Sequence, residues 1–200
     1  MGIYGIKPRF QQALTGVQDR LVAWGVHPDV LTYAGLAISV AGGGALACSE
    51  HAPWLLWLVP PAAFLRTALN ALDGMVAKAA GVARPWGEVL NEFCDRLADI
   101  ALFGGLAVSA PERALPGLAV LLGVLLSSYL GVLSKAAGGP RQYGGIMGKA
   151  DRMIWLSVAS VAAVTLGPAV WPVFLLAVAA GVLVTIVQRA VATHAALQSH

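Results

Sequence analysis

Long apolar runs separated by short polar connections dominate this chain, and they predict a bundle of membrane-spanning helices. A helix needs about 20 apolar residues to cross the hydrocarbon core of a bilayer. Three consecutive glycines, Gly42 to Gly44, thin the first run and indicate that it packs closely against a neighbour. We expect six spans, at about 30–48, 54–80, 86–110, 115–137, 153–166 and 170–192.

The segment before the first span, residues 6–23, has a different pattern. Its apolar side chains recur at steps of three and four residues, with basic residues such as Arg9 and Arg20 on the other side. This pattern predicts an amphipathic helix in the membrane interface, with a soluble capping helix as the alternative. The predicted fold class is an all-α integral membrane protein, with six transmembrane helices preceded by an N-terminal amphipathic interfacial helix. We expect a single membrane domain over 1–200, whose six-helix bundle occupies 28–192.

Composition and charge placement support a membrane protein and give it an orientation. The chain is 58% hydrophobic and only 12% charged, which excludes an ordinary soluble domain. Lysine and arginine gather in the N-terminal segment, the second-to-third and fourth-to-fifth connections and the tail, whereas Arg113 alone lies in the other connections. The positive-inside rule therefore predicts that both termini are cytoplasmic. Cys48 and Cys94 form no disulfide framework, and no nucleic-acid partner is expected.

The stretch from Asn70 to Asp99 interrupts the apolar pattern with carboxylates and amides. Such groups are costly within a bilayer, so they indicate a functional site. Asn70 and Asp73 are three residues apart on the second span, and Asn91, Asp95 and Asp99 recur every four residues on the third. These two helices are antiparallel neighbours joined by a short loop. Their cytoplasmic ends should therefore bring the polar side chains together.

Oxygen ligands without histidine or cysteine suit a hard cation, so the cluster predicts a Mg²⁺ site, with Mn²⁺ possible. Mg²⁺ commonly shares its coordination with substrate phosphates, which indicates phosphoryl chemistry. Gly74 and Ala77 are small residues beside Asp73, and Gly74 leaves the backbone open to a ligand. The predicted metal ligands are Asp73, Asn70, Asn91, Asp95 and Asp99.

The spacing of these residues resembles the signature of the CDP-alcohol phosphotransferases, D-x2-D-G-x2-A-R-x8-G-x3-D-x3-D. The segment HPDVLTYAGL also looks like the opening segment of many of these proteins. The resemblance covers most of the chain and is carried by the run Asn70-x2-Asp73-Gly74-x2-Ala77-Lys78-x8-Gly87-x3-Asn91-x3-Asp95.

The resemblance implies a membrane enzyme, often a homodimer, in a bacterial inner or plasma membrane. It would move a phosphatidyl-type group from a CDP-linked lipid donor to a small alcohol acceptor and release CMP. Asp95 stands in the position of the general base. Asp73 would hold the cation that bridges the pyrophosphate, and Lys78 would lie near the donor phosphates. The nucleotide-binding set implied in this way is Asn70, Gly74, Ala77, Lys78 and Gly87.

Three positions depart from the signature. Asn70 and Asn91 replace aspartates, and an amide offers a neutral oxygen. Lys78 replaces an arginine and loses its bidentate geometry. Asp99 has no counterpart in the signature, and it can be either an added metal ligand or a supporting partner of the ligands. Alternatively, the metal site has moved one turn along the third span, so that Asp95 and Asp99 form its acidic pair. The spacing from Gly87 to Asp95 matches the signature and favours the site without this shift.

The polar connection before the fifth span supplies Arg141, Lys149 and Arg152 near the predicted cytoplasmic surface. These cations can bind the phosphate of an acceptor, or they can anchor the chain to anionic lipid. Two other functions remain open for the whole chain. One is a transporter lined by the carboxylates, and the other is a family member that binds nucleotide or lipid without turnover.

Overall fold

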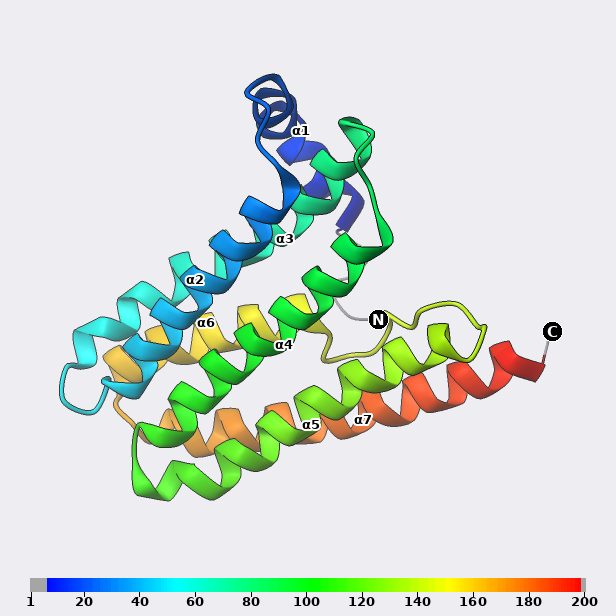
Figure 1. Ribbon diagram of the computed structural model, residues 1–200. Coiled ribbons are helices and arrows are strands. Elements are labelled where there is room, and N and C mark those ends of the chain that lie inside the picture. The colour runs from blue at the N-terminus through cyan, green and yellow to red at the C-terminus, as the bar shows by residue number, and fades with distance from the viewer. Residues whose placement is uncertain (1–6, 199–200) are drawn as a thin grey trace.

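The computed structural model describes residues 7–198 and consists of helices joined by short connections, with no strand in that range. The predicted N-terminal helix is present, although Ile6, at its expected start, lies outside the described residues. In chain order the elements are α1 (Lys7–Ala23), α2 (Pro28–Ala47), the 3₁₀ helix η2 (Pro53–Leu58), α3 (Val59–Ala79), α4 (Pro85–Val108), α5 (Pro111–Ala136), α6 (Lys149–Leu166) and α7 (Val170–Gln198) (Figure 1).

Each predicted span corresponds to a helix of this bundle. Within the described residues, four helical segments are long and apolar enough to cross a membrane: Pro28–Ala47, Pro53–Ala79, Pro111–Ala136 and Val170–Gln198. Large apolar side chains such as Leu115 and Leu176 point outward and are 80% and 73% exposed, as expected of a surface that faces lipid. The chain is therefore a multi-pass membrane protein. The charged helices α4 and α6 are not among the four.

Helix α6 begins earlier than the apolar pattern predicted. We expected the fifth span to start near Met153, but α6 starts at Lys149. The carboxylate of Asp151 accepts a hydrogen bond from the backbone N–H of Gly148 at 3.0 Å, which caps the first turn. Lys149 and Arg152 are consequently held on a helix and not in a loop.

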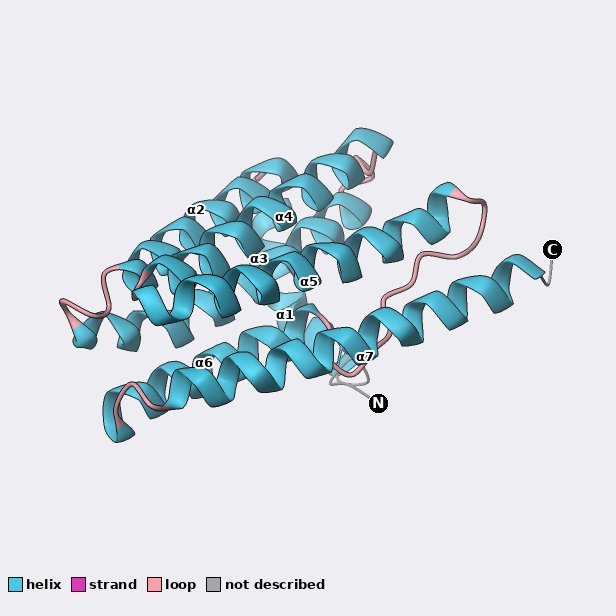
Figure 2. Cartoon of the chain, turned by 90° about the horizontal axis from the view of Figure 1, so that it is seen from below, coloured by secondary structure: helices cyan, strands magenta, loops and turns pink. Residues whose placement is uncertain are grey.

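The bundle is tightest where α2 crosses α4. A Cβ at Gly43 would lie 2.2 Å from the carbonyl oxygen of Ala101, and a Cβ at Gly105 would lie 2.2 Å from the carbonyl oxygen of Gly43. The close packing predicted from the glycine run is thus confirmed at Gly43. Figure 1 shows the α2–α3–α4 group on one side of the fold and α5 with α7 on the other, and Figure 2, seen from below, shows α7 running beside α6.

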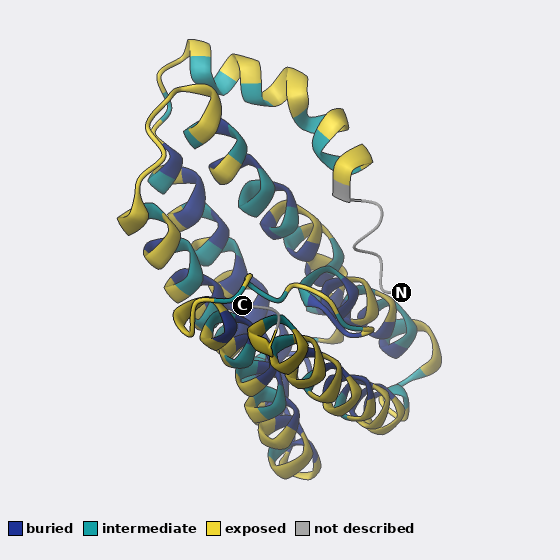
Figure 3. Ribbon diagram, turned by 90° about the vertical axis from the view of Figure 1, so that its right-hand side faces the viewer, coloured by how far each residue is buried: buried dark blue, intermediate teal, exposed yellow. Residues whose placement is uncertain are grey.

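Two apolar clusters hold these helices together. The larger includes Leu46, Phe103, Leu106 and Trp171 and joins η2 and the helices from α2 to α7. The smaller is centred on Leu31, Leu72 and Val76, and the side chains of Leu14, Leu21 and Val22 on α1 pack against it. Figure 3 shows α1 lying across one end of the bundle with its outer side exposed. This end, called the site end below, contains the polar stretch.

Candidate active site

The facing ends of α3 and α4 bring the four predicted polar side chains into direct contact. Asn70 on α3 donates its amide N–H to Asp95 on α4. Asn91 on α4 donates in the opposite direction to Oδ2 of Asp73 on α3, at 2.9 Å. Each carboxylate is therefore tied to an amide of the other helix, and the juxtaposition expected from the spacing is present.

Asp73 is buried, with only 3% of its surface exposed, and its carboxylate is extensively hydrogen-bonded. Its Oδ2 also accepts a hydrogen bond from the Thr32 hydroxyl on α2 at 2.9 Å, and its Oδ1 accepts from the backbone N–H of Gly74 at 2.6 Å. Three helices therefore fix the orientation of Asp73. A third element also reaches Asp95, whose carboxylate forms an ion pair with Lys149 on α6.

The donor set fits a hard divalent cation. Asp73 and Asp95 supply carboxylate oxygens. If the side-chain amide of Asn70 or Asn91 rotates by half a turn, its carbonyl oxygen replaces its N–H groups and can also bind a cation. Among the described residues there is no group of three or more histidine, cysteine, aspartate or glutamate side chains placed to hold a metal. A cation held here by Asp73 and Asp95 would take its other oxygens from amides, substrate phosphates or water, and Mg²⁺ is commonly bound through one or two carboxylates in this way.

The small residues of the predicted nucleotide site leave space beside Asp73. A Cβ added to Gly74 would meet no atom within 4 Å, and one added to Gly87 would make only an ordinary contact of 3.6 Å with the Arg84 side chain. Ala77 is half-buried one turn farther along α3, and Lys78 is exposed. Gly74, Ala77 and Lys78 lie in the last two turns of α3, and Gly87 lies in the first turn of α4.

Asp99 lies one turn deeper than Asp95 and is surrounded by arginines. It is fully buried and forms ion pairs with Arg66 at 2.8 Å and with Arg96 and Arg152 at 3.4 Å each. Three guanidinium groups from α3, α4 and α6 thus share one carboxylate. Of the two roles expected for Asp99, this geometry favours the supporting partner over the added metal ligand.

A second group of cations lies at the connection between α5 and α6. Arg141 forms an ion pair with Glu92 on α4, and its guanidinium stacks over the ring of Tyr143, 4.4 Å from the centroid. Arg189 on α7 donates to the carbonyl oxygens of Ser127, Tyr143 and Gly144. Arg189 therefore holds the connection that carries Arg141.

Several guanidinium nitrogens at this end have no hydrogen-bond partner. The Nε atoms of four arginines are buried and unbonded within the described chain: Arg66, Arg96, Arg141 and Arg152. Buried donors are normally satisfied. Three of these arginines surround Asp99, and the fourth, Arg141, is paired with Glu92.

Sequence reasoning missed the contributions of Thr32, Arg96 and Arg189. Thr32 lies in the segment HPDVLTYAGL, which was noted for its resemblance, and this was the available signal for it. Arg96 lies three residues before Asp99 on the same helix, so that spacing was also an available signal. Arg189 carried no such signal, because its contacts lie on segments that are distant in sequence.

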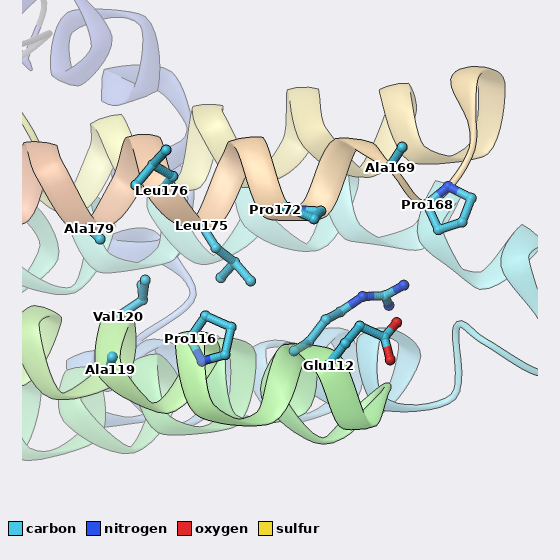
Figure 4. Close-up of a pocket in the computed structure, with 11 residues that line it drawn as sticks. Glu112, Pro116, Ala119, Val120, Pro168, Ala169, Pro172, Leu175, Leu176 and Ala179 are labelled. Carbon is cyan, nitrogen blue, oxygen red and sulfur yellow. The ribbon is translucent and has the colours of Figure 1, made fainter.

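One cavity of the bundle lies away from this site. It has a volume of about 490 Å³ and lies between α5 and α7 at the opposite end, next to Glu112 and Pro168 (Figure 4). Its walls are mainly apolar, with Val120, Pro172 and Leu175 among the lining residues. Its lining includes none of the polar residues of the α3–α4 cluster.

Comparison with known proteins places this geometry in a family, although no protein-family model matches the chain. The inner membrane protein YnbA of Escherichia coli is 35% identical over 77% of this chain and 76% of its own length. The phosphatidylinositol phosphate synthase of Mycobacterium tuberculosis is 32% identical over 90% of this chain and 85% of its own length.

A crystal structure of the M. tuberculosis synthase with CDP-DAG bound superposes with a TM-score of 0.75 and 26% identity, over 91% of this chain and 94% of that one. Another, in complex with manganese and citrate, also has a TM-score of 0.75. The predicted family is therefore confirmed. The chain belongs to the CDP-alcohol phosphotransferases, divalent-metal-dependent membrane enzymes of phospholipid biosynthesis that move a phosphatidyl-type group from a CDP-linked donor to an alcohol and release CMP.

Proposed function

We propose that this enzyme transfers the phosphatidyl group of CDP-diacylglycerol to a small alcohol that itself carries a phosphate, such as an inositol phosphate. The observation that carries the proposal is the surplus of cations at the site end, where three arginines share the one carboxylate of Asp99. Phosphate is a strong partner for guanidinium groups. The similarity to phosphatidylinositol phosphate synthases supports the same acceptor class.

In this proposal Asp73 and Asp95, with the amide oxygens of Asn70 and Asn91, hold a Mg²⁺ or Mn²⁺ ion. When bound, the ion neutralises charge on the donor pyrophosphate. Gly74, Ala77 and Gly87 leave room for the nucleotide, and Lys78 lies near the donor phosphates. Asp99 orders the arginines and does not bind the cation. These assignments rest on the resemblance and on the contacts given above.

The transfer forms one phosphorus–oxygen bond and breaks another. The acceptor hydroxyl oxygen attacks the phosphorus that carries the diacylglycerol, the bond to CMP breaks, and Asp95 takes the hydroxyl proton. Most of the rate enhancement comes from positioning and charge neutralisation. Lys149, which already contacts Asp95, lies where it can also bind a substrate phosphate.

For the acceptor phosphate we propose Arg141, Lys149 and Arg152. Arg141 has 20% of its side chain exposed, and among the described residues its carboxylate partner is Glu92. Arg152 and Arg96 are fixed by Asp99. An incoming phosphate therefore meets guanidinium groups whose orientation is already set.

The membrane arrangement that goes with this proposal has six spans, including α4 and α6, in a single membrane domain. Helix α1 lies in the interface, both termini and the site are cytoplasmic, and the enzyme is a homodimer. Support comes from the distribution of lysine and arginine and from the family resemblance. Labelling of single cysteines introduced at Arg84 and Glu112 tests the orientation, because only the first should react from the cytoplasm.

The test of the proposed function is a CMP-release assay with CDP-diacylglycerol, Mg²⁺ and a panel of acceptors. Inositol phosphate and glycerol phosphate are matched with inositol and glycerol, so that each pair differs only in its phosphate. We expect CMP release to depend on the divalent ion and to favour the phosphorylated member of a pair. Equal rates with the unphosphorylated alcohols would contradict the proposed acceptor class.

A further inference from the structure

Arg66 is a buried charge to which the proposed mechanism assigns no contact with a substrate. It lies on α3, one turn before Asn70, and none of its surface is exposed. An arginine inside a membrane bundle is costly and is usually tied to function or to a partner. The groups that Arg66 contacts indicate which part of the site it positions.

The guanidinium of Arg66 bridges one turn of α4. Its Nη2 donates to Oδ1 of Asp99 at 2.8 Å and to the backbone carbonyl oxygen of Asp95 at 3.3 Å. Its Nη1 lies 3.0 Å from the sulfur of Met153 on α6. A single side chain of α3 therefore contacts the turn that carries Asp95 and the helix that carries Lys149.

Charge balance alone does not explain this contact. Asp99 keeps two other guanidinium partners, Arg96 and Arg152, so it would remain paired without Arg66. The distinctive contact of Arg66 is the one with the Asp95 carbonyl, since no other side chain described here donates to that oxygen. A hydrogen bond at this point resists sliding or rotation of α4 against α3.

We infer that Arg66 is a positioning residue for the transfer reaction, because it fixes the turn of α4 from which the Asp95 carboxylate meets the acceptor hydroxyl. The inference rests on the proposed role of Asp95. Asn70 donates a hydrogen bond to the side-chain carboxylate of Asp95, and Arg66 donates one to the backbone carbonyl of the same residue. Both holding residues lie on α3, which also carries Asp73, so the two halves of the site are kept in register.

The test compares Arg66→Met and Arg66→Lys with Arg113→Met. Arg113 is a matched control because it is also buried, with 3% of its surface exposed, and ion-paired, but at the opposite end of the bundle. We measure kcat, both KM values, the thermal midpoint in detergent and the EPR spectrum of bound Mn²⁺. The spectrum needs no turnover and reports directly on the proposed cation oxygens of Asp95.

Arg66→Met should lower kcat at least about tenfold while both KM values change less than about twofold, since a small misplacement of a catalytic group is costly. Its Mn²⁺ spectrum should also change. Arg66→Lys keeps a charge beside Asp99 and should give an intermediate kcat. Arg113→Met should lower the thermal midpoint and leave kcat and the spectrum unchanged.

The inference is overturned if folded Arg66→Met retains the wild-type kcat and Mn²⁺ spectrum, or if Arg113→Met lowers kcat equally. Where Arg66→Met does not fold, Arg66→Lys decides, and a wild-type kcat then overturns the inference. Asp95→Asn separates this outcome from failure of the proposed function. If Asp95→Asn remains fully active, the proposed role of Asp95 is wrong. If Asp95→Asn is inactive but Arg66→Met keeps the wild-type kcat, only the proposed role of Arg66 is wrong.

Discussion

Both ends of the bundle bury an arginine, but only one end leaves guanidinium nitrogens unsatisfied. At the end away from the site, Arg113 forms an ion pair with Glu50, donates to the Ser109 hydroxyl at 3.0 Å and lies 5.5 Å from the centre of the Trp171 ring. At the site end, three arginines share Asp99, and their Nε atoms have no hydrogen-bond partner within the described residues.

This difference separates a structural charge from charges kept for a substrate. The partners of Arg113 all come from the protein, and together they join the end of α2 to α4, α5 and α7. The arginines near Asp99 exceed their carboxylate partners, so positive charge remains for an anion. A buried cation without full compensation is costly, and in the proposed function a phosphate-bearing substrate supplies the missing negative charge.

Removal of the proposed base should have the largest effect on activity. Asp95→Asn keeps the size of the side chain but cannot accept the acceptor proton, so we expect CMP release to fall by about 100-fold or more. Binding of CDP-diacylglycerol, measured separately, should persist. Glu112→Gln, a carboxylate change at the opposite end, is the control and should leave the rate unchanged. A fully active Asp95→Asn enzyme would show that another group takes the proton.

Removal of the other carboxylate should act on the metal. Asp73→Asn takes away one of the two charged oxygen groups of the proposed site, so Mn²⁺ should bind at least about tenfold more weakly, as expected when a charged ligand is lost. EPR titration of Mn²⁺ measures this affinity. Glu50→Gln is the matched change at the other end. Equal Mn²⁺ affinity in the wild type and Asp73→Asn would place the ion elsewhere.

The sequence predicted the helices and the α3–α4 cluster because both depend on local spacing. Apolar runs identify the spans, and steps of three and four residues place Asn70 with Asp73 and Asn91 with Asp95. The arginine cluster was not predictable in this way. Arg66 and Arg152 reach Asp99 from 33 and 53 residues away, and only the packing of three helices brings them together.

The start of α6 was misplaced for a related reason. Apolarity begins at Met153, but the Asp151 carboxylate caps the helix at the Gly148 N–H, and the helix therefore starts with polar residues. Hydropathy is insensitive to such a cap. The early start also shapes the candidate site, because it places Lys149 where it forms an ion pair with Asp95.

The buried pair at the opposite end should affect stability alone. Arg113→Met removes the ion pair and the contact with Trp171, but Glu50 keeps access to solvent, so the expected loss is about 1–2 kcal/mol. Thermal unfolding in detergent measures it. The kcat and KM values should match the wild type, and a fall in kcat would mean that this end is coupled to the reaction.

The acceptor specificity of one variant tests the central claim most directly, namely that the unsatisfied cations of the site end bind an acceptor phosphate. CMP release with inositol phosphate and with inositol is measured for the wild type, for Arg141→Met and for Lys135→Met, whose lysine forms an exposed ion pair with Glu88 nearby. Loss of one charged hydrogen bond predicts that Arg141→Met raises the KM for inositol phosphate about tenfold, with no change in the KM for CDP-diacylglycerol. Lys135→Met should behave as the wild type. The account would be contradicted if the wild type used inositol as well as inositol phosphate and Arg141→Met did not change this preference.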